Sequence, residues 1–206
     1  MYLSRIPLNL NKRNTMRALY SWNQFHGALA SCFSGEETRK LWRIDRLNNM
    51  LYMLVLSRDE ADFSSFCSQF GLSSNAWETK NYDLLLERLE NGTLWNFRLT
   101  ANPTISKHTD GKRGKVYAHI TPKHQMEWLM KQSEKHGFQL SYDGFYVVEN
   151  QWKNFYKKNG SRVTILSVTY EGILKITDVD LFREALIQGI GRGKAYGMGL
   201  LTVMQI

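Results

Sequence analysis

A histidine stands at the edge of a predicted helical face, where it could exchange protons with a substrate. At about 100° per residue, His26 lies roughly 60° from the centre of an apolar stripe. The stripe consists of Ala18, Trp22, Phe25, Leu29 and Cys32. Imidazole can both donate and accept a proton near neutral pH. His26 is therefore a candidate general acid or base, and the alternative is a structural residue at a helix edge.

A tyrosine six residues earlier is the candidate second catalytic group. Ser21 and Gln24 have the spacing of a capping box, which predicts a helix that begins at Trp22 and leaves Tyr20 in the preceding loop. From a loop, Tyr20 could fold back toward His26. On a continuous helix it would point about 120° away and lie about 9 Å along the axis. A packing or surface role is the alternative.

A glycine-rich run and two basic clusters could meet phosphate groups. The run Gly189–Gly199 has five glycines, so its main chain can approach another backbone closely, although a purely structural connection is the alternative. It matches neither nucleotide-binding glycine motif. The basic clusters are Lys107, Lys112, Arg113 and Lys115, and Lys153, Lys157, Lys158 and Arg162 mixed with Trp152, Phe155 and Tyr156. Such mixtures neutralise phosphates and stack on bases, although solvated lysine-rich loops are common.

The positive charge is concentrated in the second half of the chain. Residues 1–95 carry 11 Lys and Arg against 10 Asp and Glu, whereas residues 96–206 carry 16 against 9. One-sided basicity favours a polyanionic partner over a solubilising role. The basic clusters lack an amphipathic helix with a wide apolar face, which disfavours a membrane surface. The pattern therefore indicates RNA or DNA.

The hydrophobic pattern predicts an α+β fold of two tandem ferredoxin-like (RRM-like) βαββαβ units with antiparallel sheets. The first unit, residues 1–92, is expected to contain a strand over 2–10, a helix ending before Gly35, a hairpin of 41–45 and 51–56 across Asn48-Asn49, a helix over 59–70 and a strand over 77–80. The second, residues 93–206, is expected to contain strands over 94–101, 138–148, 162–176 and 200–206 and helices over 122–136 and 178–188.

The cysteine and histidine content predicts no metal and no cofactor. Cys32 and Cys67 form no CxxC motif, and the remaining histidines lack the helical spacing of a zinc pair. The amino terminus lacks an apolar signal core, and the longest apolar run, 50–56, is too short to span a bilayer. We expect a soluble protein in the reducing cytoplasm.

Four segments in order resemble the CasE family, the pre-crRNA endoribonucleases of subtype I-E CRISPR systems. They are Met1–Arg5, Phe25-His26-Gly27, Phe97–Pro103 and Gly189–Leu201. The resemblance implies cleavage of a CRISPR repeat hairpin without metal, by attack of a 2′-hydroxyl, to give a 2′,3′-cyclic phosphate and a 5′-hydroxyl. It also implies that the protein stays on the guide RNA and joins a type I-E surveillance complex.

The resemblance assigns the catalytic histidine to His26. The tyrosine usual in this family three residues earlier is replaced by Asn23, which cannot titrate, so Tyr20 is a candidate substitute. The resemblance also implies that the basic segment from Lys153 to Arg162, here called the basic hairpin, corresponds in location to the family's element that enters the groove of the RNA stem. The candidate RNA-binding residues are Arg98, Lys107, Lys112, Arg113, Lys115, Lys153, Lys157, Lys158, Arg162, Arg192 and Lys194.

Two other functions fit the same residues less closely. A non-cleaving RNA-hairpin-binding or scaffold subunit would use His26 only as a helix-edge residue. An enzyme for a small molecule on the same fold would need a compact polar pocket and would bind its substrate without strong dependence on salt, unlike an RNA-binding protein.

Overall fold

The computed structural model describes residues 1–33, 40–109, 112–157 and 160–206. The chain forms two compact units, each of which is described separately below. The first unit comprises Met1–Arg88 together with Asn154–Val163 and Lys194–Gly197, and the second comprises the remaining segments. The first unit thus includes two segments from the second half of the sequence. The expected division at residue 92 stays a prediction.

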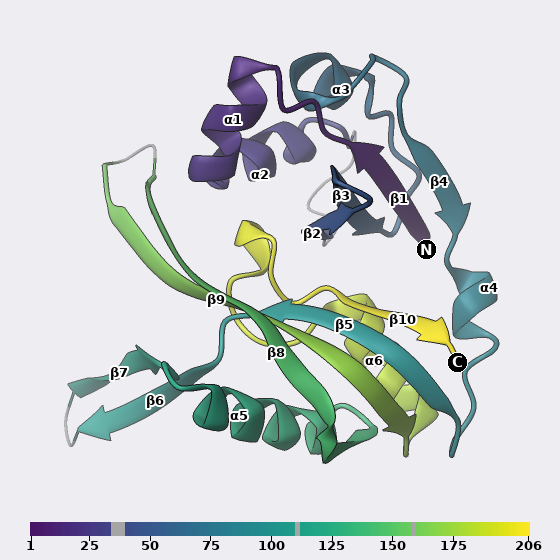
Figure 1. The fold of residues 1–206 in the computed structure, drawn as a ribbon, viewed down its shortest axis with the longest axis vertical. Helices are drawn as coiled ribbons and strands as arrows, with labels where there is room; N and C mark the ends of the chain where they lie inside the picture. The colour runs from purple at the N-terminus through teal and green to yellow at the C-terminus, as the bar shows by residue number, and fades with distance from the viewer. Residues whose placement is uncertain (34–39, 110–111, 158–159) are drawn as a thin grey trace. The chain divides into compact units, whose positions relative to one another are not determined.

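The first unit contains a ferredoxin-like sheet with the strand order β2-β3-β1-β4. Its elements are β1 (Tyr2–Pro7), α1 (Arg13–Tyr20), α2 (Asn23–Ala30), β2 (Leu41–Leu47), β3 (Met50–Ser57), α3 (Ser64–Phe70), β4 (Glu78–Asn81) and α4 (Asp83–Leu86). All of the strand pairs are antiparallel. Helices α1, α2 and α3 lie together at this sheet (Figure 1). The predicted order of strands and helices is confirmed.

The hairpin between β2 and β3 turns at the predicted position. Leu47 pairs with Met50, so Asn48 and Asn49 form a two-residue loop. Both have positive φ, at 47° and 64°. That conformation matches the right-handed twist of the flanking strands, and asparagine tolerates it better than most residues. The hairpin therefore follows directly from local sequence.

Two predicted helices have different bounds in the structure. Helix α3 begins at Ser64 rather than at residue 59, because Asp62 Oδ1 accepts a hydrogen bond from the Ser64 main-chain N–H at 2.8 Å and the buried Phe63 precedes the helix. The helix predicted to end before Gly35 ends at Ala30, and Gly35 lies outside the described residues. The side-chain hydrogen bond and the burial of Phe63 at the start of α3 are not visible in the periodicity.

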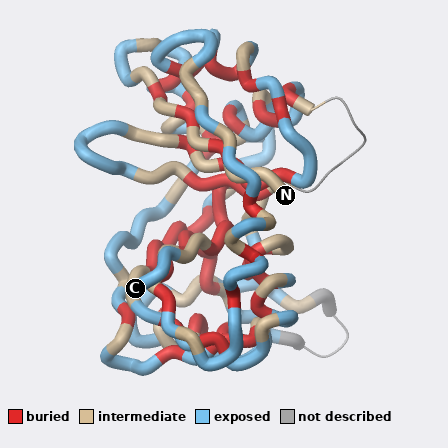
Figure 2. Tube along the Cα trace, turned by 90° about the vertical axis from the view of Figure 1, so that its right-hand side faces the viewer, coloured by how far each residue is buried: buried red, intermediate tan, exposed pale blue. Residues whose placement is uncertain are grey.

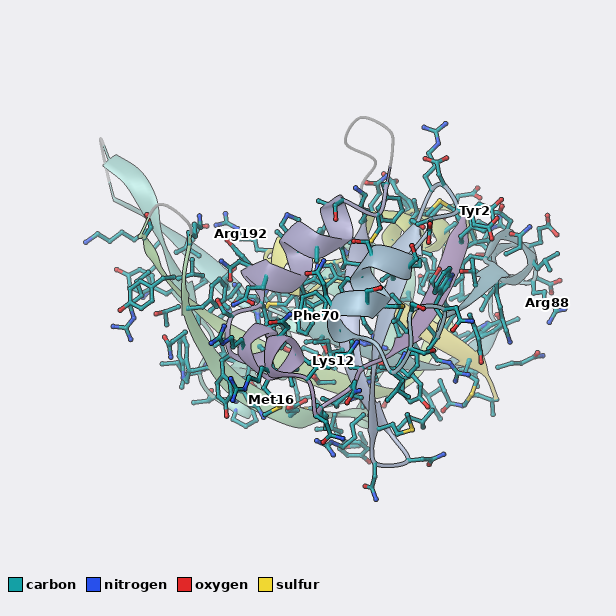
Figure 3. All side chains as sticks on the ribbon, turned by 90° about the horizontal axis from the view of Figure 1, so that it is seen from above. Tyr2, Lys12, Met16, Phe70, Arg88 and Arg192 are labelled. Carbon is teal, nitrogen blue, oxygen red and sulfur yellow. The ribbon has the colours of Figure 1, made fainter. Side chains whose placement is uncertain are left out.

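Helices α1 and α3 are joined by polar contacts at the end of α3. Lys12 Nζ donates to the main-chain oxygens of Cys67 and Ser68 at 3.1 and 2.8 Å, and the Thr15 hydroxyl donates to the Phe70 oxygen at 3.1 Å (Figure 3). The last carbonyls of a helix have no partner within the helix, and a cation there also complements the helix dipole. These bonds fix α1 beside α3.

The second unit repeats the topology with the strand order β10-β5-β9-β8. Its elements are β5 (Leu94–Ala101), β6 (Thr104–Thr109), β7 (Lys112–Ala118), α5 (Pro122–Lys135), β8 (Phe138–Tyr156), β9 (Arg162–Ile176), α6 (Val179–Gln188), the 3-10 helix η1 (Lys194–Tyr196) and β10 (Leu201–Gln205), although η1 and the end of the β8–β9 hairpin belong to the first unit. The tandem ferredoxin-like prediction is confirmed. The β6–β7 ribbon was not predicted, and β8 extends eight residues beyond residue 148.

Helices α5 and α6 pack on the second sheet through aromatic rings. Trp128 of α5 stacks with Tyr170 of β9 at 6.4 Å between ring centroids, and Phe182 of α6 meets Phe138 of β8 at 5.6 Å. Figure 2 shows buried residues concentrated in the strands and in the helices, with connecting segments mostly exposed. Within the described residues, no helix is long and apolar enough to cross a membrane.

The first-unit core depends on Phe25, which is fully buried. Its ring lies 5.1 Å from that of Phe70 and 6.1 Å from those of Phe66 and Trp42. We expect Phe25→Ala to lower the free energy of unfolding by about 3–5 kcal/mol in urea titrations, because it removes a buried ring and leaves a cavity. The exposed Leu84 provides a control, since Leu84→Ala should change stability by less than about 0.5 kcal/mol. Equal losses of unfolding free energy in Phe25→Ala and Leu84→Ala would contradict the central role of Phe25 in this core.

Candidate active site

The segment before His26 is two helices rather than one. Helix α1 ends at Tyr20 and α2 begins at Asn23, and Ser21 between them is non-helical, with φ of −140° and ψ of 76°. All five predicted stripe residues are nevertheless buried. Trp22 occupies the break, and its Nε1 donates to the Leu19 oxygen at 2.9 Å, which satisfies a carbonyl at the end of α1. The stripe is confirmed, and the single continuous helix is wrong.

The predicted capping box is also wrong. The Ser21 hydroxyl donates to Asn23 Oδ1 at 2.6 Å instead of accepting a main-chain N–H of α2. Tyr20 is the last residue of α1 rather than part of a loop. Its side chain is 78% exposed and makes no hydrogen bond within the described residues. Tyr20 is therefore accessible to a substrate, but it has no contact with His26 that would fix it as a catalytic partner.

His26 lies on the exposed side of α2, one residue after the buried Phe25. Among the described residues, no group forms a hydrogen bond with its ring. Partial burial lowers the pKa of His26 below its ordinary value of 6.5, and the positive charge of Lys40 lowers the pKa further. Both effects favour the neutral imidazole. In the free protein at neutral pH, His26 is therefore ready to accept a proton.

Two distant segments lie beside α2 in the first unit. The Asn23 side-chain amide donates to the Tyr156 main-chain oxygen in the β8–β9 hairpin at 3.1 Å. Phe155 is 4% exposed, and its ring lies 4.9 Å from that of Tyr196 in η1. Helix η1 also packs against α2 and β2. The hairpin end and the η1 segment of the glycine-rich run thus both lie near the helix that carries His26.

The structure places the predicted site residues in both units. His26, Tyr20, Lys157, Arg162 and Lys194 belong to the first unit. Arg98, Lys107, Lys112, Arg113, Lys115, Lys153 and Arg192 belong to the second. Lys158 lies outside the described residues. The first unit therefore brings the candidate catalytic histidine together with cations from segments more than a hundred residues away.

In the hairpin end, the cations next to the turn are exposed. Lys157 and Arg162 flank a turn in which the Lys157 N–H bonds the Ser161 oxygen at 2.9 Å and the Gly160 N–H bonds the Lys157 oxygen at 3.0 Å. Lys153 differs from them, because it is half-buried and its Nζ donates to Gln151 Oε1 at 2.7 Å. Burial lowers the pKa of Lys153, and Glu149 opposes that change. Lys157 and Arg162 are therefore better placed than Lys153 to meet a phosphate.

The cations of the second unit have different surroundings. Arg98 forms an ion pair with Glu171 across β5 and β9, which reduces the charge it presents. Arg98 and Glu171 line an open pocket of about 510 Å³ together with Tyr146 and Met204. Arg192 is exposed on the glycine-rich run (Figure 3). Arg192 is thus the more accessible of the two arginines.

The β6–β7 ribbon was missed as an element, although its cations were identified. Lys107 and Lys115 are directly opposite each other, and Lys112 and Arg113 lie in β7. The like charges of Lys107 and Lys115 repel each other, and an anion bound between these two side chains would relieve the repulsion. The Asp110-Gly111 pair between two alternating runs was the available sequence signal for a hairpin.

The glycine-rich run meets the core at Gly197. A Cβ atom there would lie 2.7 Å from Cζ3 of Trp42, and the residue has φ of 71°. Both the backbone conformation and the available space therefore require glycine. The structural alternative for this run thus holds at Gly197. Within the described residues, no group of three or more His, Cys, Asp or Glu side chains could hold a metal ion.

Gly197→Ala should lower the free energy of unfolding by about 1–3 kcal/mol or more, because the new Cβ must displace the Trp42 ring and adopt a strained φ. Gly27→Ala is the matched control, since Gly27 lies in α2 and a Cβ atom added there would meet nothing within 4 Å. Alanine there should stabilise the helix by up to about 1 kcal/mol. Urea titration of the two variants measures the difference, and a Gly197→Ala protein as stable as the native one would refute this role.

Comparisons with known proteins agree with this architecture. The family model for "CRISPR associated protein" matches residues 1–205. The CRISPR-associated endoribonuclease Cse3 of Thermus thermophilus is 29% identical over 98% of this chain and 99% of its own. A structure of Cse3 bound to a 19-nucleotide RNA superposes with a TM-score of 0.83 at 27% identity, covering 99% of this chain and 100% of that one.

A chain from a CRISPR RNA-guided surveillance complex also has this fold. Its TM-score is 0.74 at 23% identity, and the match covers 100% of both chains. The family match spans nearly the whole sequence, and the match to the Cse3 structure covers both units. The chain belongs to this CRISPR-associated protein family, as its resemblance to CasE predicted.

Proposed function

We propose that this chain is an endoribonuclease that cuts the hairpins of CRISPR repeat transcripts to give guide RNAs. The observation that carries the proposal is the exposed imidazole of His26, which has no hydrogen bond within the described residues and lies in a unit that also holds the basic hairpin end. The similarity over almost the whole chain to a named endoribonuclease supports the same activity. A non-cleaving RNA-binding subunit is the alternative.

The proposed reaction uses the RNA's own 2′-hydroxyl as nucleophile. Neutral His26 accepts the hydroxyl proton while the 2′-oxygen forms a bond to the adjacent phosphorus and the bond to the 5′-oxygen breaks. The products are a 2′,3′-cyclic phosphate and a 5′-hydroxyl, with no water consumed and no change of oxidation state. The chemistry requires proton transfer and charge stabilisation, both of which side chains can supply without a metal.

The leaving 5′-oxygen needs a proton, and two side chains of the first unit are candidates to supply it. Tyr20 has an exposed hydroxyl, and Lys194 lies in η1, which packs against α2. Asn23 cannot donate a titratable proton. A cation near the reacting phosphate would also stabilise the negative charge that develops there.

RNA binding is proposed to rest on cations from both units. A-form hairpins present phosphates and 2′-hydroxyls rather than a readable major groove, so shape and charge dominate recognition. The proposed contacts come from Arg98, Lys107, Lys112, Arg113, Lys115, Lys153, Lys157, Lys158, Arg162, Arg192 and Lys194. We also propose that the protein retains its product in the cytoplasm within a type I-E surveillance complex, since a structurally similar chain occurs in a CRISPR RNA-guided surveillance complex.

His26→Ala should abolish cleavage and preserve binding. Loss of a general acid or base typically lowers a rate by about 10²–10⁴-fold. A labelled repeat hairpin is incubated in EDTA with each protein, and the product ends are analysed. Gln24→Ala, at an exposed neighbour on α2, is the matched control and should cut normally. Tight binding without cleavage by the native protein would establish the scaffold alternative, and binding unaffected by salt would favour a small-molecule enzyme.

The pH dependence of cleavage should report the neutral form of His26. The base is active above its pKa, so the rate at low RNA concentration should fall as pH decreases through an inflection below 6.5 and level off above it. The measurement is the single-turnover rate at limiting RNA across this range. A rate that instead falls as pH rises through the inflection would mean that His26 acts as the acid.

A further inference from the structure

The first residue of α2 is tied to the β8–β9 hairpin by one hydrogen bond, and a second bond from Ser21 holds its amide group. The Ser21 hydroxyl donates to Asn23 Oδ1 at 2.6 Å, and Asn23 Nδ2 donates to the Tyr156 main-chain oxygen at 3.1 Å. A carbonyl oxygen can only accept, so the amide nitrogen must face Tyr156. The reversed amide would set two oxygens against each other. The orientation of the Asn23 amide is therefore determined by its neighbours.

The hydrogen bond to Tyr156 fixes the point at which the hairpin begins its turn. Tyr156 is the last residue of β8, and the next residue, Lys157, opens the turn that ends at Arg162. At the preceding residue of this strand end, the buried Phe155 packs on Tyr196. The strand end thus has both an aromatic contact and a hydrogen bond from Asn23.

The same hydrogen bond links the strand end that precedes Lys157 to the helix that carries His26. Asn23 and His26 are three residues apart on one helix and therefore lie on neighbouring positions of its surface. A hairpin anchored at Asn23 keeps Lys157 at a defined position with respect to the imidazole. Without the anchor, Lys157 would still be present, but its position relative to α2 would be less restricted.

We infer that Asn23 is a positioning residue that holds the phosphate-binding end of the β8–β9 hairpin beside the catalytic helix. The inference rests on the proposed RNA cleavage and adds a role for the residue that replaces the tyrosine usual in this family. Asn23 acts through Lys157 and the hairpin and not on the reacting atoms. Both of its polar groups are already engaged by the protein.

Three variants separate the two hydrogen bonds. Asn23→Ala removes both bonds. Asn23→Asp keeps the shape and the acceptor for Ser21 but cannot donate to the Tyr156 oxygen. Ser21→Ala removes only the first bond and is the matched control. Thermal unfolding of each variant shows whether the protein still folds, and all later measurements use folded protein.

The expected result is a loss of hairpin affinity that is coupled to Lys157. Asn23→Ala should weaken binding of the repeat RNA by roughly two- to tenfold, the effect of one hydrogen bond, whereas Ser21→Ala should change it little. The slope of log affinity against log salt should decrease by up to about one in both Asn23→Ala and Lys157→Ala, as expected for one lost phosphate contact. The double variant should bind no more weakly than Lys157→Ala alone, because both changes remove the same contact.

Three outcomes would overturn the inference. Additive losses in the double variant would mean that Asn23 and Lys157 act separately. Unchanged binding with a slower single-turnover rate at saturating protein would place Asn23 at the reacting atoms. Unchanged RNA binding together with an unchanged cleavage rate would mean that Asn23 has no role in either. Failure of the native protein to cleave refutes the proposed function instead, and the binding measurements with Lys157→Ala still decide the role of Asn23.

Discussion

The position of α2, which carries the candidate catalytic residue His26, depends on the packing of aromatic rings around Trp42. The ring centroids of Phe25 and Trp22 lie 6.1 and 5.7 Å from that of Trp42, and a Cβ atom at Gly197 would lie 2.7 Å from Cζ3 of Trp42. A single buried side chain of β2 thus supports both α2 and the glycine-rich run. Because protein interiors are close-packed, a change of volume here would shift every element that the ring touches. The placement of His26 is therefore a consequence of core packing.

The cations of the protein include both buried, paired side chains and exposed ones. The buried Arg43 is paired with Asp45 by two hydrogen bonds of 2.8 and 2.7 Å, which offsets the cost of removing its charge from water. Lys157 and Arg162, in contrast, remain exposed beside the hairpin turn. A cation that stays in water keeps its charge available for a phosphate. The net charge of +8 therefore counts cations that differ from one another in pairing and burial.

Asn23 stands where the CasE family usually has a tyrosine, and its positioning role is a proposal that rests on two hydrogen bonds. An asparagine side chain is short and offers a donor and an acceptor close to the backbone. At the start of α2 these groups meet Ser21 and the Tyr156 carbonyl. The imidazole of His26 keeps its exposed position three residues later. The proposed site therefore includes the hydrogen bond from α2 to the hairpin as well as the histidine.

The sequence by itself determined the repeated βαββαβ order of the two units, the apolar stripe around His26 and the Asn48-Asn49 turn, because periodicity and turn conformation are local properties. The resemblance of four segments to the CasE family added the assignment of His26 as the candidate catalytic residue. Only the tertiary structure decided the break at Ser21, the start of α3 at Ser64 and the bond from Asn23 to Tyr156, 133 residues away. A helix end or a long-range hydrogen bond depends on partners brought together by folding, and the local pattern of residues contains no record of them.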